Sequence, residues 1–140
     1  MNINKDILDI LDQEVTKSME LNEIPIGAVI IDSEQNIIAS GHNTRQSDSN
    51  VLGHAEINTI LEAEKVIKDW RLDGYSMIVS LEPCTMCESV INECRLDKVY
   101  YLLKSNYANS SDNSFIELEG YEPYKEKYDK YLKKFFHNMR

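Results

Sequence analysis

Apolar residues recur at helical spacing near the start of the chain. The positions that predict a helix over residues 4–21 are Ile7, Ile10, Leu11, Val15 and Met19. Asn22 follows the last of them and suits the end of a helix. Two short runs rich in β-formers come next, at residues 26–31 and 37–40. The polar stretch between them is typical of a turn, so we expect a β-hairpin.

The middle of the chain alternates between helical and strand patterns. After a polar loop at residues 44–50, a helix is predicted from His54, with an apolar stripe made of Ile57, Ile60, Leu61 and Ile67. Residues 76–81 are apolar enough for a central strand. A helix from Pro83 to about Cys94 follows, because proline suits the first helical position.

The last part of the chain predicts two strands and a closing helix. Residues 98–103 form the fourth strand and residues 115–119 a possible fifth. Only ten polar residues, 105–114, lie before the possible fifth strand. A parallel crossover needs about a dozen residues or more, so we expect this strand to be short, antiparallel or absent. The final helix is amphipathic, with Tyr124, Tyr128, Tyr131, Leu132, Phe135 and Phe136 as its apolar set.

This order of elements predicts an α/β fold. Strands and helices that alternate after residue 50 indicate a parallel portion with helices on both faces of the sheet. The opening hairpin adds antiparallel strands, so the sheet is expected to be mixed. A length of 140 residues suits one domain, which we place over residues 1–140.

Composition narrows the class of protein. No apolar run approaches the roughly 20 residues of a membrane-spanning helix, and the first residues lack a signal-peptide pattern. Two of the three cysteines stand in one Cys-x-x-Cys, which favours a metal site in a reducing compartment over disulfides. We therefore expect a cytoplasmic protein with no membrane partner.

The charge of the chain is unevenly distributed. The net charge is −9, which alone argues against nucleic-acid binding. Residues 123–140, however, contain six cations and two anions, so this end carries +4 and the rest of the chain −13. A basic end is compatible with a polyanionic partner or with a solvated helix face.

Two short motifs carry the chemistry. His54-Ala55-Glu56 is followed 27 residues later by Pro83-Cys84-Thr85-Met86-Cys87. His54, Cys84 and Cys87 suit a zinc ion with three protein ligands and water in the fourth position. Glu56 is then a spare carboxylate. This His-x-Glu and Pro-Cys-x-x-Cys combination is an established signature of zinc-dependent base deaminases, so the match is a recognition of a known pattern.

The predicted elements place both motifs at helix starts, where free N–H groups favour the thiolates of Cys84 and Cys87. Zinc would lower the pKa of its water, which is the expected nucleophile. Glu56 would take a proton from that water and return it to a ring nitrogen and then to the leaving amine. The predicted reaction is hydrolytic loss of ammonia from an amino-substituted heterocycle.

The cysteines and histidines also allow other interpretations. A structural zinc site would need a fourth protein ligand, and the candidates are Cys94, His42 and His137. Cys94 is expected to point into the core, and His42 is expected to be a loop histidine. Asn43 either contacts a base edge through its amide or is a turn residue.

The chain resembles the cytidine/deoxycytidylate deaminase superfamily in five stretches: Gly27-Ala28-Val29, Gly41-His42-Asn43, His54-Ala55-Glu56, Asp69-Trp70-Arg71-Leu72 and Leu81-Glu82-Pro83-Cys84-Thr85-Met86-Cys87. Within it, the most similar branch is the bacterial tRNA-specific adenosine deaminases, on the basis of Trp70-Arg71-Leu72 and the terminal Tyr131-Leu132-Lys133-Lys134-Phe135-Phe136. The resemblance covers residues 5–103 and about the last ten.

The resemblance implies a three-layer α/β/α sandwich around a mixed five-stranded sheet, and a homodimer. It implies Zn²⁺ held by His54, Cys84 and Cys87, Glu56 as proton shuttle, and Asn43 as a base-contacting residue. The implied reaction converts adenosine to inosine at the wobble position of a tRNA anticodon loop, with the basic terminal helix on phosphates.

Two further functions stay open at this point. The short segment after Lys104 and the acidic body motivate a deaminase of a free base or nucleoside, of the guanine, cytosine or cytidine type. A non-catalytic partner subunit or a nucleic-acid-binding protein that keeps zinc for folding is a third hypothesis, and the intact Glu56 argues against it.

Overall fold

The computed structural model describes residues 2–105 and 115–138. Its helices and strands, in chain order, are α1 (Lys5–Glu20), β1 (Gly27–Ile31), β2 (Ile37–His42), α2 (Ala55–Ile67), β3 (Ser76–Leu81), α3 (Thr85–Glu93), β4 (Lys98–Leu103), β5 (Phe115–Glu117) and α4 (Glu122–Asn138). Within the described ranges, no helix has the length and apolar character needed to cross a membrane.

The strands form one mixed sheet in the order β2-β1-β3-β4-β5. β1 runs antiparallel to both β2 and β3, whereas β3, β4 and β5 run parallel to one another. Successive residues of β1 face opposite sides. Ala28 and Ile30 join the core beneath α2 and α3, while Val29 and Ile31 join the core beneath α1 and α4.

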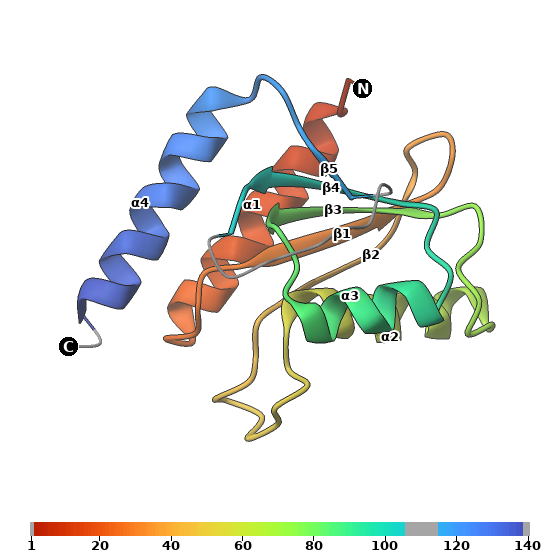
Figure 1. Cartoon of the computed structure of the whole chain (residues 1–140), viewed down its shortest axis with the longest axis horizontal. Helices are drawn as coiled ribbons and strands as arrows, with labels where there is room; N and C mark the ends of the chain where they lie inside the picture. Colours follow the sequence, from red (N-terminus) through yellow and green to blue (C-terminus); the bar gives the residue numbers. More distant parts are fainter. Residues whose placement is uncertain (1, 106–114, 139–140) are drawn as a thin grey trace.

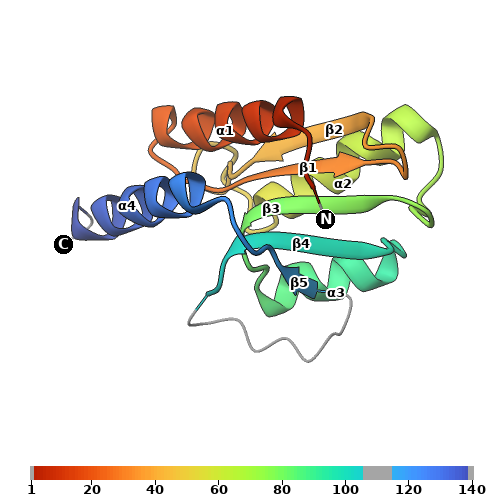
Figure 2. The same cartoon turned by 90° about the horizontal axis from the view of Figure 1, so that it is seen from above.

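Helices cover both faces of the sheet. α2 and α3 lie next to each other on one face, and α1 and α4 pack on the other (Figures 1 and 2). Tyr128 of α4 is fully buried against α1, where its hydroxyl donates to Asp12 Oδ1 at 3.1 Å. The predicted α/β/α sandwich with a mixed five-stranded sheet is therefore confirmed.

The fifth strand is short and parallel. β5 pairs with β4 from Val99↔Phe115 to Tyr101↔Glu117, so the antiparallel and absent alternatives are wrong. Phe115 packs against the core on the α2 and α3 side, and Leu118 is buried in the opposite core, which fixes the segment at the sheet edge. The predicted polar loop over residues 105–114 lies, from residue 106 onward, outside the described residues.

Several predicted boundaries and faces need correction. α3 starts at Thr85 rather than Pro83, because Glu82 N–H still donates to Leu103 O at 2.8 Å and so continues the strand pairing. β2 extends to His42, which pairs with Gly27, so His42 is a strand residue. Leu61 is 50% exposed and does not belong to the buried face of α2.

A close approach of α2 to β2 brings the end of β2 to the start of the helix. Gly41 permits it, because a Cβ at this position would lie 2.6 Å from Thr59 Oγ1. Thr59 is fully buried, and its hydroxyl donates to Ala55 O at 2.7 Å. The residues that follow β2 therefore lie against the first turn of α2.

Candidate active site

The two sequence motifs meet where α2 and α3 begin. His54 is the N-cap residue of α2 and Cys84 is the N-cap residue of α3, both with extended backbone. Neither side chain forms a capping hydrogen bond. A β-to-α turn after β3 places Cys84 beside His54, so two segments 30 residues apart in sequence form one cluster.

The three side chains have the spacing of zinc ligands. His54 Nδ1 lies 3.7 Å from Cys84 Sγ and 3.4 Å from Cys87 Sγ, and all three ligand atoms lie within 4.8 Å of one another. Tetrahedral zinc with bond lengths of about 2.0–2.3 Å holds its ligand atoms roughly 3.5 Å apart. The donor set and its geometry therefore fit one zinc ion.

A fourth protein ligand is absent from this cluster in the described part of the chain. The group that could hold a metal consists of His54, Cys84 and Cys87 alone. Cys94 is buried at the end of α3, as predicted, and its thiol lies 3.3 Å from Ile91 O. His42 Nδ1 instead lies 3.3 Å from Glu14 Oε1. This arrangement favours three protein ligands and an open position.

The thiols differ in their protonation. Hydrogen bonds with Cys87 and His54 lower the pKa of Cys84 to about 3, so Cys84 is a thiolate. The hydrogen bond with Cys84 and burial raise the pKa of Cys87, and the bond to Cys84 raises the pKa of His54. A second negative charge beside Cys84 is disfavoured, so Cys87 would give up its proton on binding a metal ion. The expectation that both cysteines bind zinc as thiolates stays a prediction.

Glu56 lies in the first turn of α2 beside the cluster. Its side chain is 3% exposed, and it is not among the residues that could share the metal. Burial raises the pKa of Glu56 to about 7, despite the opposing charge of His54. A carboxyl group with this pKa exchanges protons near neutral pH.

Asn43 follows the last residue of β2 and is 4% exposed. Its Oδ1 accepts a hydrogen bond from Ala55 N–H at 2.7 Å. Ala55 is the first residue of α2, so its N–H has no acceptor within the helix. This bond fixes the orientation of the Asn43 amide, which leaves Nδ2 as a donor that it can offer a ligand.

Two residues that support this site were not identified from the sequence. The carboxylate of Glu23, which is 2% exposed, accepts from Gln46 N–H at 3.1 Å and Ser47 N–H at 2.7 Å. Asn58 of α2 also binds the segment after β2. In the sequence, Glu23 follows the first predicted helix and Asn58 lies inside the second, and neither residue belongs to a motif. The burial of the Glu23 carboxylate is visible only in the structure.

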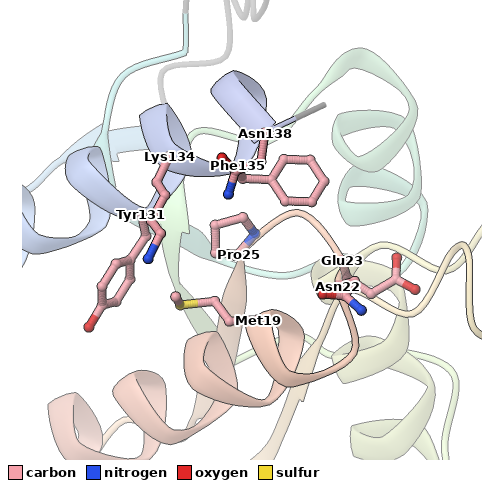
Figure 3. A pocket seen from close by; sticks show the side chains of 8 residues that line it. All are labelled: Met19, Asn22, Glu23, Pro25, Tyr131, Lys134, Phe135 and Asn138. Carbon is pink, nitrogen blue, oxygen red and sulfur yellow. The ribbon is translucent and has the colours of Figure 1, made fainter. Parts of the chain in front are cut away.

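Two neighbouring cavities lie beneath the end of α4 and together are called the groove here; Asn43 lines one of them. A cavity of about 360 Å³ is lined by Glu23, Asn43, Arg45, Gln46, Phe135 and Phe136. A neighbouring cavity of about 250 Å³ shares Asn22, Glu23 and Phe135 with it and adds Tyr131 and Lys134. In Figure 3, Phe135 and Lys134 project from α4 on one side of Pro25, with Met19 of α1 on the other.

Comparison with known proteins places this site in a family. A model of the cytidine and deoxycytidylate deaminase zinc-binding region matches residues 1–103. The chain belongs to the cytidine and deoxycytidylate deaminase family. The matched region contains both motifs and every strand except β5.

Similar members of the family are tRNA-specific adenosine deaminases. The protein of this name from Rickettsia typhi is 38% identical over 135 residues, which cover 88% of this chain and 90% of that one. The one from Rickettsia felis is 44% identical over 85 residues, covering 60% of this chain and 59% of that one. The match therefore spans less than two thirds of the Rickettsia felis relative.

Solved structures give a consistent result. One from a study of A-to-I editing by tRNA:A34 deaminases at the wobble position has a TM-score of 0.75 and 26% identity, and the match covers 81% of this chain and 98% of that one. Guanine deaminase from Bacillus subtilis has a TM-score of 0.67 at 22% identity, with 92% and 95% covered, and shares the fold.

Proposed function

We propose that this protein is a zinc-dependent hydrolytic deaminase that converts adenosine to inosine at the wobble position of a tRNA. The observation that carries the proposal is the buried Glu56 beside a cluster of His54, Cys84 and Cys87, to which the described residues supply no fourth protein ligand. The family match and the names of the similar proteins support this reaction class and this substrate.

His54 Nδ1, Cys84 Sγ and Cys87 Sγ would hold the zinc ion. When bound, zinc acts as a Lewis acid that lowers the pKa of water at the open position. Glu56 takes one proton from the attacking water and delivers it to a ring nitrogen of the base, and it then carries the second proton of that water to the departing amine. Its raised pKa suits both transfers near neutrality. The net reaction exchanges an amino group for oxygen and releases ammonia.

Asn43 contacts the base edge in this proposal. Its Oδ1 is held by Ala55 N–H, so it presents Nδ2 as a donor. A donor at this place requires an acceptor on the substrate, such as a ring nitrogen of adenine. Asn43 therefore orients the base and Glu56 moves the protons. Glu56 lies in the first turn of α2, and Asn43 is hydrogen-bonded to that turn.

The groove beneath α4 supports a polynucleotide substrate. Its lining includes Asn43, Arg45 and the exposed Phe136 in one cavity and Lys134 in the neighbouring one. Aromatic and basic side chains along a groove suit unpaired bases and their phosphates. A free base would use only the end near Asn43, so the rest of the groove favours an anticodon loop over a small molecule.

A homodimer is the proposed assembly. Several large apolar side chains are exposed in or after α2, and Leu61, Val66 and Trp70 are 50%, 61% and 53% exposed. Leu61 and Trp70 line the same shallow depression. A second copy packed on this surface would remove them from water. Sedimentation equilibrium is the test, and a monomer at micromolar concentration contradicts the proposal.

The decisive assay uses the zinc-loaded protein and an anticodon stem-loop with adenosine at the wobble position. Inosine and an equal amount of ammonia are expected, and a stem-loop with guanosine at that position serves as the control. Ammonia from free guanine, cytosine or cytidine, with no inosine in the stem-loop, would overturn the tRNA assignment in favour of a small-molecule deaminase.

A further inference from the structure

Asn58 connects α2 to the segment that carries Asn43. It lies four residues after His54, and its backbone N–H donates to His54 O at 2.9 Å. Its side-chain Nδ2 donates to His42 O and to Thr44 Oγ1, both at 2.8 Å. The two acceptors belong to the residues immediately before and after Asn43. A single amide therefore holds both neighbours of the residue that faces the substrate.

Two atoms of Asn43 are held by three partners from three different segments. Its N–H lies within hydrogen-bond distance of Ser18 Oγ at 3.2 Å and Ile26 O at 3.3 Å, and its Oδ1 binds Ala55 N–H. The backbone bonds set the place of Asn43, whereas the bond to Ala55 sets the direction of its amide. That direction holds only while the loop keeps its distance from α2.

We propose that Asn58 is a positioning residue that keeps the Nδ2 group of Asn43 in register with His54 and Glu56. The inference rests on the proposed function, because it assumes that Asn43 contacts the base. α2 supplies His54 and Glu56 from its start, the Ala55 N–H from its first residue and the Asn58 amide one turn later. The first turn of α2 therefore sets the positions of both the group that contacts the base and the group that transfers protons.

Loss of this link has a specific consequence. Without the Asn58 amide, His42 O and Thr44 Oγ1 lose a shared donor, and the loop can move away from α2. A displacement of about 1 Å between a substrate contact and a catalytic group costs up to about 100-fold in rate. Zinc binding is expected to be unaffected, because the hydrogen bonds of the Asn58 side chain go to His42 and Thr44 and not to His54, Cys84 or Cys87.

The kinetic test compares Asn58→Ala, Asn43→Ala and the double variant on the anticodon stem-loop. Asn58→Ala is expected to lower kcat/KM by at least about tenfold while zinc content stays at the wild-type level. In the double variant, kcat/KM should be no lower than in Asn43→Ala, because Asn58 acts through Asn43. If the kcat/KM losses of the two single variants multiply in the double variant, the inference is wrong.

Two further variants separate positioning from general stability. Thr44→Val removes one of the two Asn58 bonds and keeps the shape of the side chain, so a smaller loss than in Asn58→Ala is expected. Lys65→Ala removes an exposed ion pair with Glu62 on the same helix and serves as the matched control. An equal loss in Lys65→Ala would contradict the assigned role.

Hydrogen exchange tests the inference without any activity. The Ala55 amide reports the Asn43 bond, and the residue 58 amide reports the helix through His54 O. In Asn58→Ala, faster exchange at Ala55 with unchanged exchange at residue 58 supports positioning. Wild-type exchange at Ala55, or faster exchange at both amides, overturns it. If the wild-type protein does not deaminate the stem-loop, the proposed function fails while this measurement still decides the structural link.

Discussion

The metal cluster and the groove beneath α4 are built in different ways. His54, Glu56, Cys84 and Cys87 come from two short motifs at the starts of adjacent helices, and each motif spans less than two helical turns. The groove combines the end of α1, the segment after β2 and the last turns of α4. The chemistry is thus encoded locally, whereas the surface that would choose the substrate depends on contacts between distant segments.

The largest expected effect lies at the metal cluster. Cys87→Ala removes a fully buried side chain that we propose as a zinc ligand, and it should abolish both stoichiometric zinc binding and deamination. Cys94→Ala, which also removes a buried thiol of the same polypeptide segment, should keep one zinc per chain, because Cys94 bonds to Ile91 O instead. Metal analysis of the two purified variants is the measurement. Equal zinc content in the two variants would contradict the assignment of Cys87 as a zinc ligand and Cys94 as a core residue.

Glu56→Gln is expected to have the next largest effect. An amide of the same size cannot shuttle protons, so kcat should fall by about 10²- to 10⁴-fold while zinc content and fold are retained. Glu62→Gln is the matched control, since Glu62 is an exposed carboxylate on the same helix, paired with Lys65. Single-turnover assays on the stem-loop compare the two, and wild-type turnover in Glu56→Gln removes Glu56 from the mechanism.

Zinc affinity should fall as the solution becomes more acidic. The pKa of His54 is raised above 6.5 and that of Cys87 above 9.0, so both groups carry a proton at about pH 6. A metal ion must displace both protons, and each one displaced weakens binding by about tenfold per pH unit below its pKa. Cys84, with a pKa of about 3, contributes nothing to this slope. Chelator competition between about pH 5 and 8 measures it, and a flat profile contradicts these protonation states.

The same contrast explains what could be predicted from sequence. The pattern of residues 98–103 predicts a strand with the observed bounds, and the two motifs by themselves group His54, Cys84 and Cys87. These inferences rest on periodicity and on a motif, which are local. The start of α3 was misplaced because Glu82 pairs with Leu103 across the sheet, a contact that no local pattern contains.

The supporting residues of the site were missed for the same reason. Glu23 is buried because Gln46 and Ser47 donate to it, and those donors lie 23 and 24 residues away.

Leu61 sits at an apolar position of the predicted stripe and is nevertheless half exposed. Phe115 and Leu118 hold β5 at the sheet edge by packing into opposite cores. A strand of three residues is too short for its periodicity to predict such packing.

The smallest expected effect tests the groove by itself. Lys134 lines it, whereas the neighbouring Lys133 is 77% exposed at its side chain and pairs with Asp129 at 2.8 Å. Each substitution to alanine removes one positive charge from the same turn of α4. Lys134→Ala should weaken stem-loop binding and reduce the slope of log K against log salt by about 1, while Lys133→Ala should leave that slope unchanged. kcat at saturating stem-loop should be the same in both, because neither side chain reaches Glu56 or the metal cluster. Equal slopes for the two variants would mean that the excess positive charge of residues 123–140 acts as a diffuse field, and that the groove does not contact the phosphates.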